Sequence, residues 1–394
     1  MKFGYKQTIY ASYIGYITQA IVNNLAPLLF IIFRDEFGLS LSNITFFVTI
    51  NFFIQLFVDL AATKFVDKIG YRKCIMAAHI CCAAGLIAMA VLPILIGNAF
   101  VGLLIAVAVY AVGGGLIEVL ISPIVEACPT DNKTAAMSLL HSFYCWGTVL
   151  VILITTLALH FFSKDSWKII ACAWAVVPIF NVFLFSKVPI NTLTEEGLGM
   201  QNKELFKNKN FWLFVLLMIA AGASEQAMSQ WASAFAETGL GVSKTVGDLA
   251  GPCMFSILMG IARAVNSKIT EKYNITTLML ISGVLCMGSY LLASLSANTV
   301  LALAGCGLCG LSVGIMWPGA FSMASKSFPK GGTSLFALLA LAGDLGCMSG
   351  PTIVGEIAGA AGDSLKTGLL FSIAFPIILI VCCFMLKRKR LGNE

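Results

Sequence analysis

Twelve long apolar segments, separated by short polar or charged connections, constrain this chain more than any other feature. A helix of about twenty apolar residues crosses the hydrocarbon core of a bilayer, and each segment reaches that length. The runs are continuous, which excludes a β-barrel, whose strands alternate over about ten residues. We therefore predict an all-α membrane protein with transmembrane helices at 7–33, 42–66, 73–95, 99–125, 134–161, 166–186, 211–236, 244–270, 275–295, 298–325, 333–360 and 364–386.

The composition agrees with this class. Of 394 residues, 59% are hydrophobic and 11% are charged, and the mean hydropathy is +0.91. A soluble domain of this length carries more charge than that. The thirteen cysteines lie almost all in apolar segments without metal-ligand spacing, so they indicate reduced, buried side chains. No phosphate-binding loop or hydrolase motif is present, so we expect neither an enzyme nor a bound cofactor or metal.

The distribution of basic residues predicts the orientation in the membrane. With a cytoplasmic N-terminus, twenty of the 25 Lys and Arg residues fall on the inner side and five on the outer side. Loops on the cytoplasmic side carry such an excess. We expect a multi-pass protein of the cell inner membrane with both termini cytoplasmic, and a monomer. The N-terminus is interpreted as a first transmembrane helix and not as a removable signal. The basic tail is an anchor, so nucleic acid is excluded as a partner.

The chain divides into two halves around one long polar connection. We predict an N-terminal six-helix bundle over 1–187, a cytoplasmic linker over 188–210, and a C-terminal six-helix bundle with a basic tail over 211–394. Spans four and ten both combine a glycine cluster, a bulky or charged residue and a proline. Weak similarity at corresponding places is typical of parallel repeats, so the halves are expected to be pseudo-symmetric.

The first and fourth spans contain the strongest site candidates. Glu118 lies in the middle of the apolar stretch AVGGGLIEVLISP, where a charge is costly and usually faces a cavity, a partner or a proton route. Tyr16, Gln19 and Asn23 fall at i, i+3 and i+7, and Asn24 follows them. Phenol and amide groups suit a polyhydroxylated ligand. The alternatives are a protonated glutamate that locks two helices together, and hydrogen bonds that only join helices.

The seventh span contains the sequence SEQAMSQW. Gln226 and Gln230 are separated by four residues and share a helix face, and Glu225 directly precedes Gln226. Trp231 and Trp317 are candidates for stacking on a sugar ring. The alternative is that these tryptophans are interfacial anchors. All five residues are predicted to contact a substrate.

Three other polar residues complete the set. His141 and Asp344 are predicted to contact substrate and to carry protons with Glu118. The alternative for His141 is a simple hydrogen bond. Arg263 is assigned to conformational change and is expected to pair with an acid such as Asp344, or to extend toward the membrane surface. Asp59 is expected to lie close enough to the cytoplasmic face to be solvated or paired, and it is left outside the site.

The connection between spans two and three carries a family resemblance. It reads Thr63-Lys-Phe-Val-Asp67-Lys-Ile-Gly70-Tyr-Arg72-Lys. This resembles the cytoplasmic loop G-x-x-x-D-R/K-x-G-x-R-R/K of the major facilitator superfamily, with Thr63 in place of the first glycine. The resemblance implies the major facilitator fold and a conformational role for Asp67, Gly70 and Arg72. Gly70 would permit a tight turn, and Asp67 would cap a helix end.

Within that superfamily, the chain is most similar to the fucose/hexose–proton symporter group. The similarity is carried by GLIE118 with Pro123, by LHSFYCWG from Leu140, by Glu225 followed by Trp231, and by GIMWP around Trp317. One position departs from the group: Asn23 stands where the first span often has a carboxylate, and an amide does not titrate.

These observations predict a secondary active transporter of a small polar solute, with a monosaccharide or polyol as the best assignment. The resemblance implies alternating access and proton symport through Glu118. The alternatives are a proton-independent facilitator, an exporter of amphipathic compounds and a membrane sensor without transport. A membrane-embedded enzyme is disfavoured because no nucleophile and base are paired in the sequence.

Overall fold

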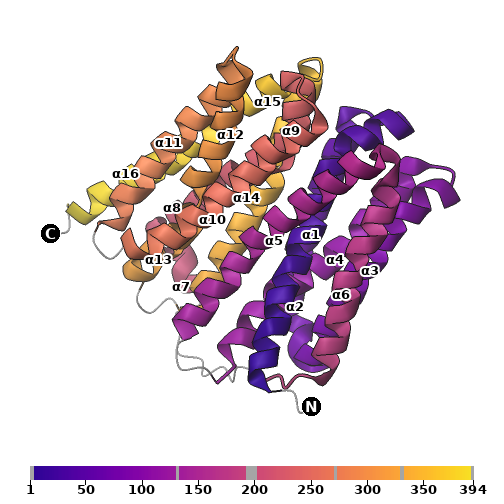
Figure 1. Cartoon of the computed structure of the whole chain (residues 1–394). Coiled ribbons are helices and arrows are strands. Elements are labelled where there is room, and N and C mark those ends of the chain that lie inside the picture. The colour runs from indigo at the N-terminus through magenta and orange to yellow at the C-terminus, as the bar shows by residue number, and fades with distance from the viewer. Residues whose placement is uncertain (1–3, 130–132, 192–201, 270–272, 329–331, 392–394) are drawn as a thin grey trace. The chain divides into compact units, whose positions relative to one another are not determined.

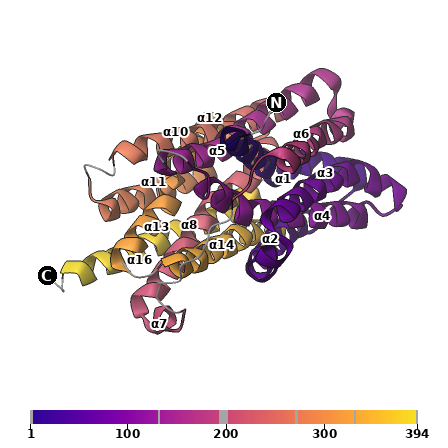
Figure 2. The same cartoon turned by 90° about the horizontal axis from the view of Figure 1, so that it is seen from below.

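The computed structural model describes residues 4–129, 133–191, 202–269, 273–328 and 332–391, and within these ranges every regular element is helical. The chain forms two compact units, Met1–Glu195 and Glu196–Glu394. Figures 1 and 2 show the helices of each unit from two directions. The division falls inside the predicted connection 188–210, of which residues 192–201 lie outside the described ranges.

The first unit contains six long helices and one short turn. They are α1 (Tyr5–Phe37), α2 (Leu41–Ile69), α3 (Tyr71–Leu95), α4 (Ala99–Glu126), α5 (Lys133–Phe162), η1 (Lys164–Ser166) and α6 (Trp167–Lys187).

The second unit contains six further spans, several of which are interrupted. Its elements are α7 (Asn202–Lys207), α8 (Lys209–Ala234), η2 (Phe235–Gly239), α9 (Lys244–Asp248), η3 (Leu249–Cys253), α10 (Met254–Ile269), α11 (Ile275–Leu295), α12 (Thr299–Val313), α13 (Met316–Ser327), α14 (Gly332–Ala360), α15 (Leu365–Phe371) and α16 (Ala374–Leu391).

Among the described residues, twelve helical spans are long and apolar enough to cross a membrane. The predicted all-α fold, with twelve transmembrane helices in two six-helix halves, is confirmed. The resemblance between spans four and ten is only partial at the level of the backbone. In the fourth span, α4 continues through Pro123, whereas the tenth span is interrupted between α12 and α13, just before Pro318.

Helix ends follow local capping chemistry. Ser40, Asn98, Asn274 and Asn298 each accept a hydrogen bond from a backbone N–H in the first turn of α2, α4, α11 and α12. Such side chains satisfy donors that have no partner inside the helix. At the other end of α1, Gly38 adopts a φ of 64°, which is a left-handed conformation that glycine takes without strain.

The connection between α2 and α3 is a single glycine. Gly70 has a φ of 94°, and its N–H donates to the carbonyl of Val66 at the end of α2. The same residue directly precedes α3. Arg72 donates from Nη1 to the carbonyl of Phe185 at 2.5 Å and from Nη2 to that of Val188 at 2.7 Å. It thereby satisfies carbonyls at the C-terminal end of α6. Asp67 lies in the last turn of α2, and its side chain is outside the described part.

The spans with the largest share of buried residues are α1 and α8, and both carry polar residues. In the most apolar 18-residue stretch of α1, 89% of the residues are buried. The corresponding shares are 72% for the span that contains α8 and 39% for α2. Close packing between neighbouring helices depends on glycine. In the first unit, α3 and α4 lie side by side in both views (Figures 1 and 2), and a Cβ at Gly113 would overlap the carbonyl of Ala78. The fold therefore places α1 and α8 where polar side chains need internal partners.

Candidate functional site

In the first unit, the stripe predicted on α1 faces two neighbouring helices. Tyr16, Gln19 and Asn23 are all at least nine-tenths buried. The Tyr16 hydroxyl lies 2.9 Å from Ser122 Oγ on α4. Gln19 and Asn23 bond instead to α2, as described next. The spacing of i, i+3 and i+7 therefore places three buried polar groups on the contacts of α1 with α2 and α4.

Four amides join α1 to α2. Gln19 Nε2 donates to Gln55 Oε1 at 3.1 Å, and Gln55 Nε2 donates to Asn23 Oδ1 at 2.9 Å and to Asn51 Oδ1 at 3.0 Å. Asn51 Nδ2 lies 3.4 Å from Asn23 Oδ1. All four residues are buried. Amides offer both donors and acceptors, so this network can exchange its internal bonds for bonds to a ligand.

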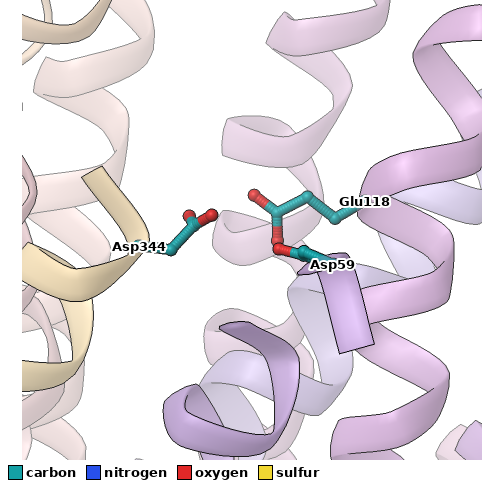
Figure 3. A group of neighbouring side chains, drawn as sticks. All are labelled: Asp59, Glu118 and Asp344. Atoms are coloured by element: carbon teal, nitrogen blue, oxygen red, sulfur yellow. The ribbon is translucent and has the colours of Figure 1, made fainter. Parts of the chain in front are cut away.

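Glu118 borders the amide network from α4. Gln19 Nε2 also donates to Glu118 Oε2, at 3.2 Å. One carboxylate oxygen of Asp59 and one of Glu118 lie within 4.8 Å of each other, and Figure 3 shows the two carboxylates side by side. Both residues are partly exposed. We call Gln19, Asn23, Asn51, Gln55, Asp59 and Glu118 the amide–carboxylate cluster.

Two other predicted residues make contacts outside this cluster. The His141 ring packs against the Tyr16 ring, with centroids 5.4 Å apart, and His141 is exposed. Asn24 is turned toward α5: its Nδ2 donates to the carbonyl of Ala20 at 2.9 Å and to Thr148 Oγ1 at 3.3 Å. His141 is therefore adjacent to the polar stripe, while Asn24 joins α1 to α5.

The polar residues of α2 are absent from the predicted site. Asn51, Gln55 and Asp59 follow one another at intervals of four residues, which is the spacing of a helix face. This stripe was a usable signal in an otherwise apolar segment. Asp59 had been placed near the cytoplasmic face and outside the site, whereas the structure places it beside Glu118.

In the second unit, the polar residues of α8 form a chain that ends on an arginine. Arg263 Nη2 on α10 lies 3.4 Å from Glu225 Oε2. Gln226 Nε2 approaches Glu225 Oε1 at 3.4 Å, and Gln230 Nε2 donates to Gln226 Oε1 at 3.1 Å. This hydrogen bond places Gln226 and Gln230 on one face of α8, as their spacing of four residues predicts. We call these four residues the α8–Arg263 group. Arg263 thus pairs with an acid on α8.

The two candidate tryptophans of this unit differ. Trp231 is completely buried, and its indole N–H donates to the carbonyl of Pro351 at 2.8 Å. In this structure its ring packs helices together and offers no face to a solute. Trp317 is partly exposed and lies against Gly343 of α14, where a Cβ would overlap the indole ring. The next residue, Asp344, is partly exposed and is also drawn in Figure 3.

Two further buried polar groups lie away from these sets. His79 Nδ1 bonds to the carbonyl of Ile75 at 2.8 Å, so that nitrogen carries the proton, and its Nε2 accepts from Asn181 Nδ2 at 2.8 Å. Lys244 Nζ lies 3.0 Å from Asp248 Oδ2, with both side chains more than nine-tenths buried. His79 joins α3 to α6, whereas Lys244 and Asp248 pair within α9 and Lys244 Nζ also reaches Ser233 Oγ of α8 at 3.4 Å, which explains their burial without a ligand.

The arrangement of the first unit supports two kinds of chemistry. Its amides and the Tyr16 hydroxyl can bind hydroxyl groups of a solute, and its carboxylates can take up a proton or a cation. Carboxylate oxygens are hard ligands, so Asp59 and Glu118 together could hold a metal ion. No nucleophile is paired with a base within either described set, as hydrolysis would require.

Comparisons with known proteins agree with the fold. A curated relative, "Membrane protein MosC" of Rhizobium meliloti, is 27% identical over 187 residues, which are 48% of this chain and 45% of that protein. The alignment therefore spans about half the length of this relative.

Solved structures match over almost the whole chain. A D-xylose–proton symporter superposes with a TM-score of 0.77 at 14% identity, covering 96% of each chain. The E. coli fucose:proton symporter FucP gives 0.67 at 14% identity, covering 96% of this chain and 98% of that one. The nucleoside transporter NupG gives 0.76 at 13% identity, with the same coverage of 96% and 98%. At these identities the likeness establishes a shared fold.

The family assignment rests on the sequence itself. Residues 12–351 match the Major Facilitator Superfamily, a family of transporters and not of enzymes. This range includes both polar sets and the connection at Gly70. Together with twelve membrane spans in two units, the match shows that this chain belongs to the Major Facilitator Superfamily.

Proposed function

We propose that this transporter moves a small polyhydroxylated solute, such as a monosaccharide or polyol, by alternating access with proton symport through Glu118. The observation that carries the proposal is the contact of Glu118 with the buried amide of Gln19 inside a membrane-spanning unit. A carboxylate in such a place costs free energy, which points to a role in binding or coupling.

Solute binding is assigned to both polar sets. The Tyr16 hydroxyl and the amides of Gln19, Asn23 and Gln55 provide donors and acceptors in the first unit, together with His141 and Asn24. The second unit provides Glu225, Gln226, Gln230, Trp317 and Asp344. Amides that bond to one another can exchange those bonds for bonds to the hydroxyl groups of a solute. Trp231 is not assigned a direct contact with the solute, because its ring is fully buried.

Proton coupling is assigned to Glu118, with His141 and Asp344 as further proton carriers. Protonation removes the charge of Glu118, which lowers the cost of moving its helix through a water-excluded state. A loaded carrier would therefore reorient with Glu118 protonated. Asp67, Gly70, Arg72 and Arg263 are assigned to the conformational change, since Gly70 and Arg72 connect helix ends of the first unit. We further propose an inner-membrane monomer with cytoplasmic termini.

A facilitator is the second candidate. Asn23 replaces the carboxylate that the fucose/hexose–proton symporter group often carries in its first span, and here its Oδ1 accepts from two amides. With one fewer titratable group, solute movement would follow its own gradient and be independent of the proton gradient.

The deciding experiment is uptake of radiolabelled monosaccharides and polyols into proteoliposomes, with and without an inward proton gradient. Wild type is compared with Glu118→Gln and with Glu356→Gln, a matched loss of one carboxylate at an exposed position. We expect accumulation driven by the gradient in wild type and Glu356→Gln. In Glu118→Gln, accumulation should be lost while solute exchange continues.

Each other outcome has a distinct meaning. Full concentrative uptake by Glu118→Gln would reject Glu118 as the coupling residue. Equal wild-type fluxes with and without the gradient would establish the facilitator. Absence of flux for every sugar and polyol would reject this solute class and leave the fold unaffected.

A further inference from the structure

The neighbourhood of Glu118 collects oxygen acceptors from three helices of one unit. Asp59 of α2 and Glu118 of α4 bring carboxylates within 4.8 Å of each other. The amide oxygens of Gln19 of α1 and Gln55 of α2 both lie 3.3 Å from the position that a Cβ on Gly114 of α4 would take. Two neighbouring carboxylates repel each other in a medium of low dielectric constant, so an occupant that carries positive charge is favoured.

A separate observation shows that one of these oxygens has no donor. Gln19 Nε2 donates to both Gln55 Oε1 and Glu118 Oε2. Exchanging the nitrogen and oxygen of this amide would set oxygen against oxygen twice, so its orientation is fixed by its partners. Gln19 is 3% exposed, and its Oε1 has no hydrogen-bond partner among the described residues. A buried acceptor without a partner costs free energy unless a ligand occupies its lone pairs.

The unsatisfied oxygen points toward the carboxylate face of α4. A Cβ built on Gly114 would stand 3.3 Å from Gln19 Oε1 and 3.3 Å from Gln55 Oε1. Both amide oxygens therefore lie next to Gly114. Glu118 follows four residues later on the same face of α4. Because Gly114 has no side chain, it leaves the space beside these oxygens free of carbon.

We propose that Gln19 Oε1, Gln55 Oε1 and the carboxylates of Asp59 and Glu118 form a binding site for a monovalent metal cation, Na+. A single proton satisfies one acceptor, whereas a cation is coordinated by several oxygens at once. Mg2+ demands near-octahedral geometry and gives up water reluctantly, so it suits this site poorly. The inference rests on the proposed function for its meaning: an ion bound at Glu118 would be a coupling ion of the transporter.

Binding of the ion alone tests this site. The full chain is purified, reconstituted in nanodiscs and titrated with 22Na+ at fixed pH in choline chloride, without solute. Wild type is compared with Asp59→Asn, Glu118→Gln, Gln19→Met and Gly114→Ala. Gln19→Met keeps the length of the side chain without its oxygen, and Gly114→Ala places a methyl group against both amide oxygens. Glu356→Gln is the control for loss of a carboxylate elsewhere.

We expect saturable binding of a single Na+ in wild type and in Glu356→Gln. In each of the four site variants, the affinity for Na+ should fall by about tenfold or more. A rise of the melting temperature with NaCl over choline chloride, present in wild type and absent in the site variants, provides a second readout. Melting in choline chloride alone establishes that each variant is folded.

Three results would overturn the inference: no saturable Na+ binding by wild type, unchanged affinity in folded Gln19→Met and Asp59→Asn, or displacement of 22Na+ by Ca2+ at lower concentrations than by NaCl. The results also distinguish failure of this site from failure of the proposed function. Solute uptake driven by a proton gradient without Na+ binding would reject the site alone. Na+ binding lost in the site variants, with no flux of any sugar or polyol, would support the site and reject the transport proposal.

Discussion

At the scale of residues, burial of polar groups in apolar helices is the main cost of this fold. Gln19, Asn23 and Gln55 meet that cost by bonding to one another, and Glu225 does so by pairing with Arg263. Hydrogen bonds between membrane helices contribute modestly, by about 0.6 kcal/mol on average. The larger effect is the penalty for leaving one partner buried without the other.

The pair of Glu225 and Arg263 gives a prediction at this scale. Glu225→Gln and Arg263→Gln should each lower the free energy of unfolding by about 2 kcal/mol, because each leaves a charge without its partner. The double variant should lose less than the sum of the two. Thermal melting followed with a thiol-reactive dye measures this, since eleven of the thirteen cysteines are buried.

The control is a similar cycle on Glu36 and Lys168, whose side chains are each 31% exposed and whose ion pair is 2.6 Å long. Exposed pairs contribute about 1 kcal/mol or less, so the coupling there should be small. Strict additivity at Glu225 and Arg263 would show that the two charges do not stabilise each other.

At the scale of elements, glycines decide how closely helices approach. In the second unit, α8 and α14 are in contact, and a Cβ at Gly346 would overlap the carbonyl of Ile219. A Cβ at Gly350 would stand 2.6 Å from the carbonyl of Ala223. Contacts of this kind with backbone atoms are not relieved by a change of side-chain rotamer. Small residues at such crossings are typical of membrane helices.

We therefore expect Gly346→Ala to destabilise the protein by about 1–3 kcal/mol, because α8 and α14 must separate to accept a methyl group. Gly288→Ala is the matched control in a helix of the same unit, since a Cβ at Gly288 meets nothing within 4 Å. Its effect should be neutral or slightly stabilising, because alanine favours helix more than glycine does. Equal melting temperatures for the two variants would contradict this account of the α8–α14 contact.

At the scale of the whole molecule, charge at the ends of helices sets the orientation that transport needs. The basic residues of the C-terminal tail and of the segments near 68–73 and 203–209 are predicted to face the cytoplasm. Each unit has an even number of spans, so the ends of each unit lie on the same side of the membrane.

Fusion reporters measure this orientation. A green fluorescent protein fused after residue 394 should fluoresce, and an alkaline phosphatase at the same place should be inactive, because both would be cytoplasmic. A phosphatase fused within 363–366, between the last two spans, should be active. An active phosphatase at the C-terminus would invert the proposed topology.

The sequence determined the architecture because its signals are local. Hydropathy over about twenty residues located the spans, and spacing on α1 and α8 placed Tyr16, Gln19 and Asn23, and likewise Gln226 and Gln230, on shared faces. Ser40 and Asn98 indicate helix starts through capping chemistry confined to one turn. These interactions depend on neighbours in the chain, so they can be predicted from the order of residues.

Only the tertiary structure decided which polar faces meet. Asp59 and Gln55 lie beside Glu118, Arg263 pairs with Glu225, and Trp231 is enclosed and bonded to Pro351. Each of these outcomes depends on how a helix is rotated about its axis and on which helix packs beside it. Glycines and apolar side chains scattered along the whole chain set that packing, so the partner of a buried charge cannot be predicted from its own segment.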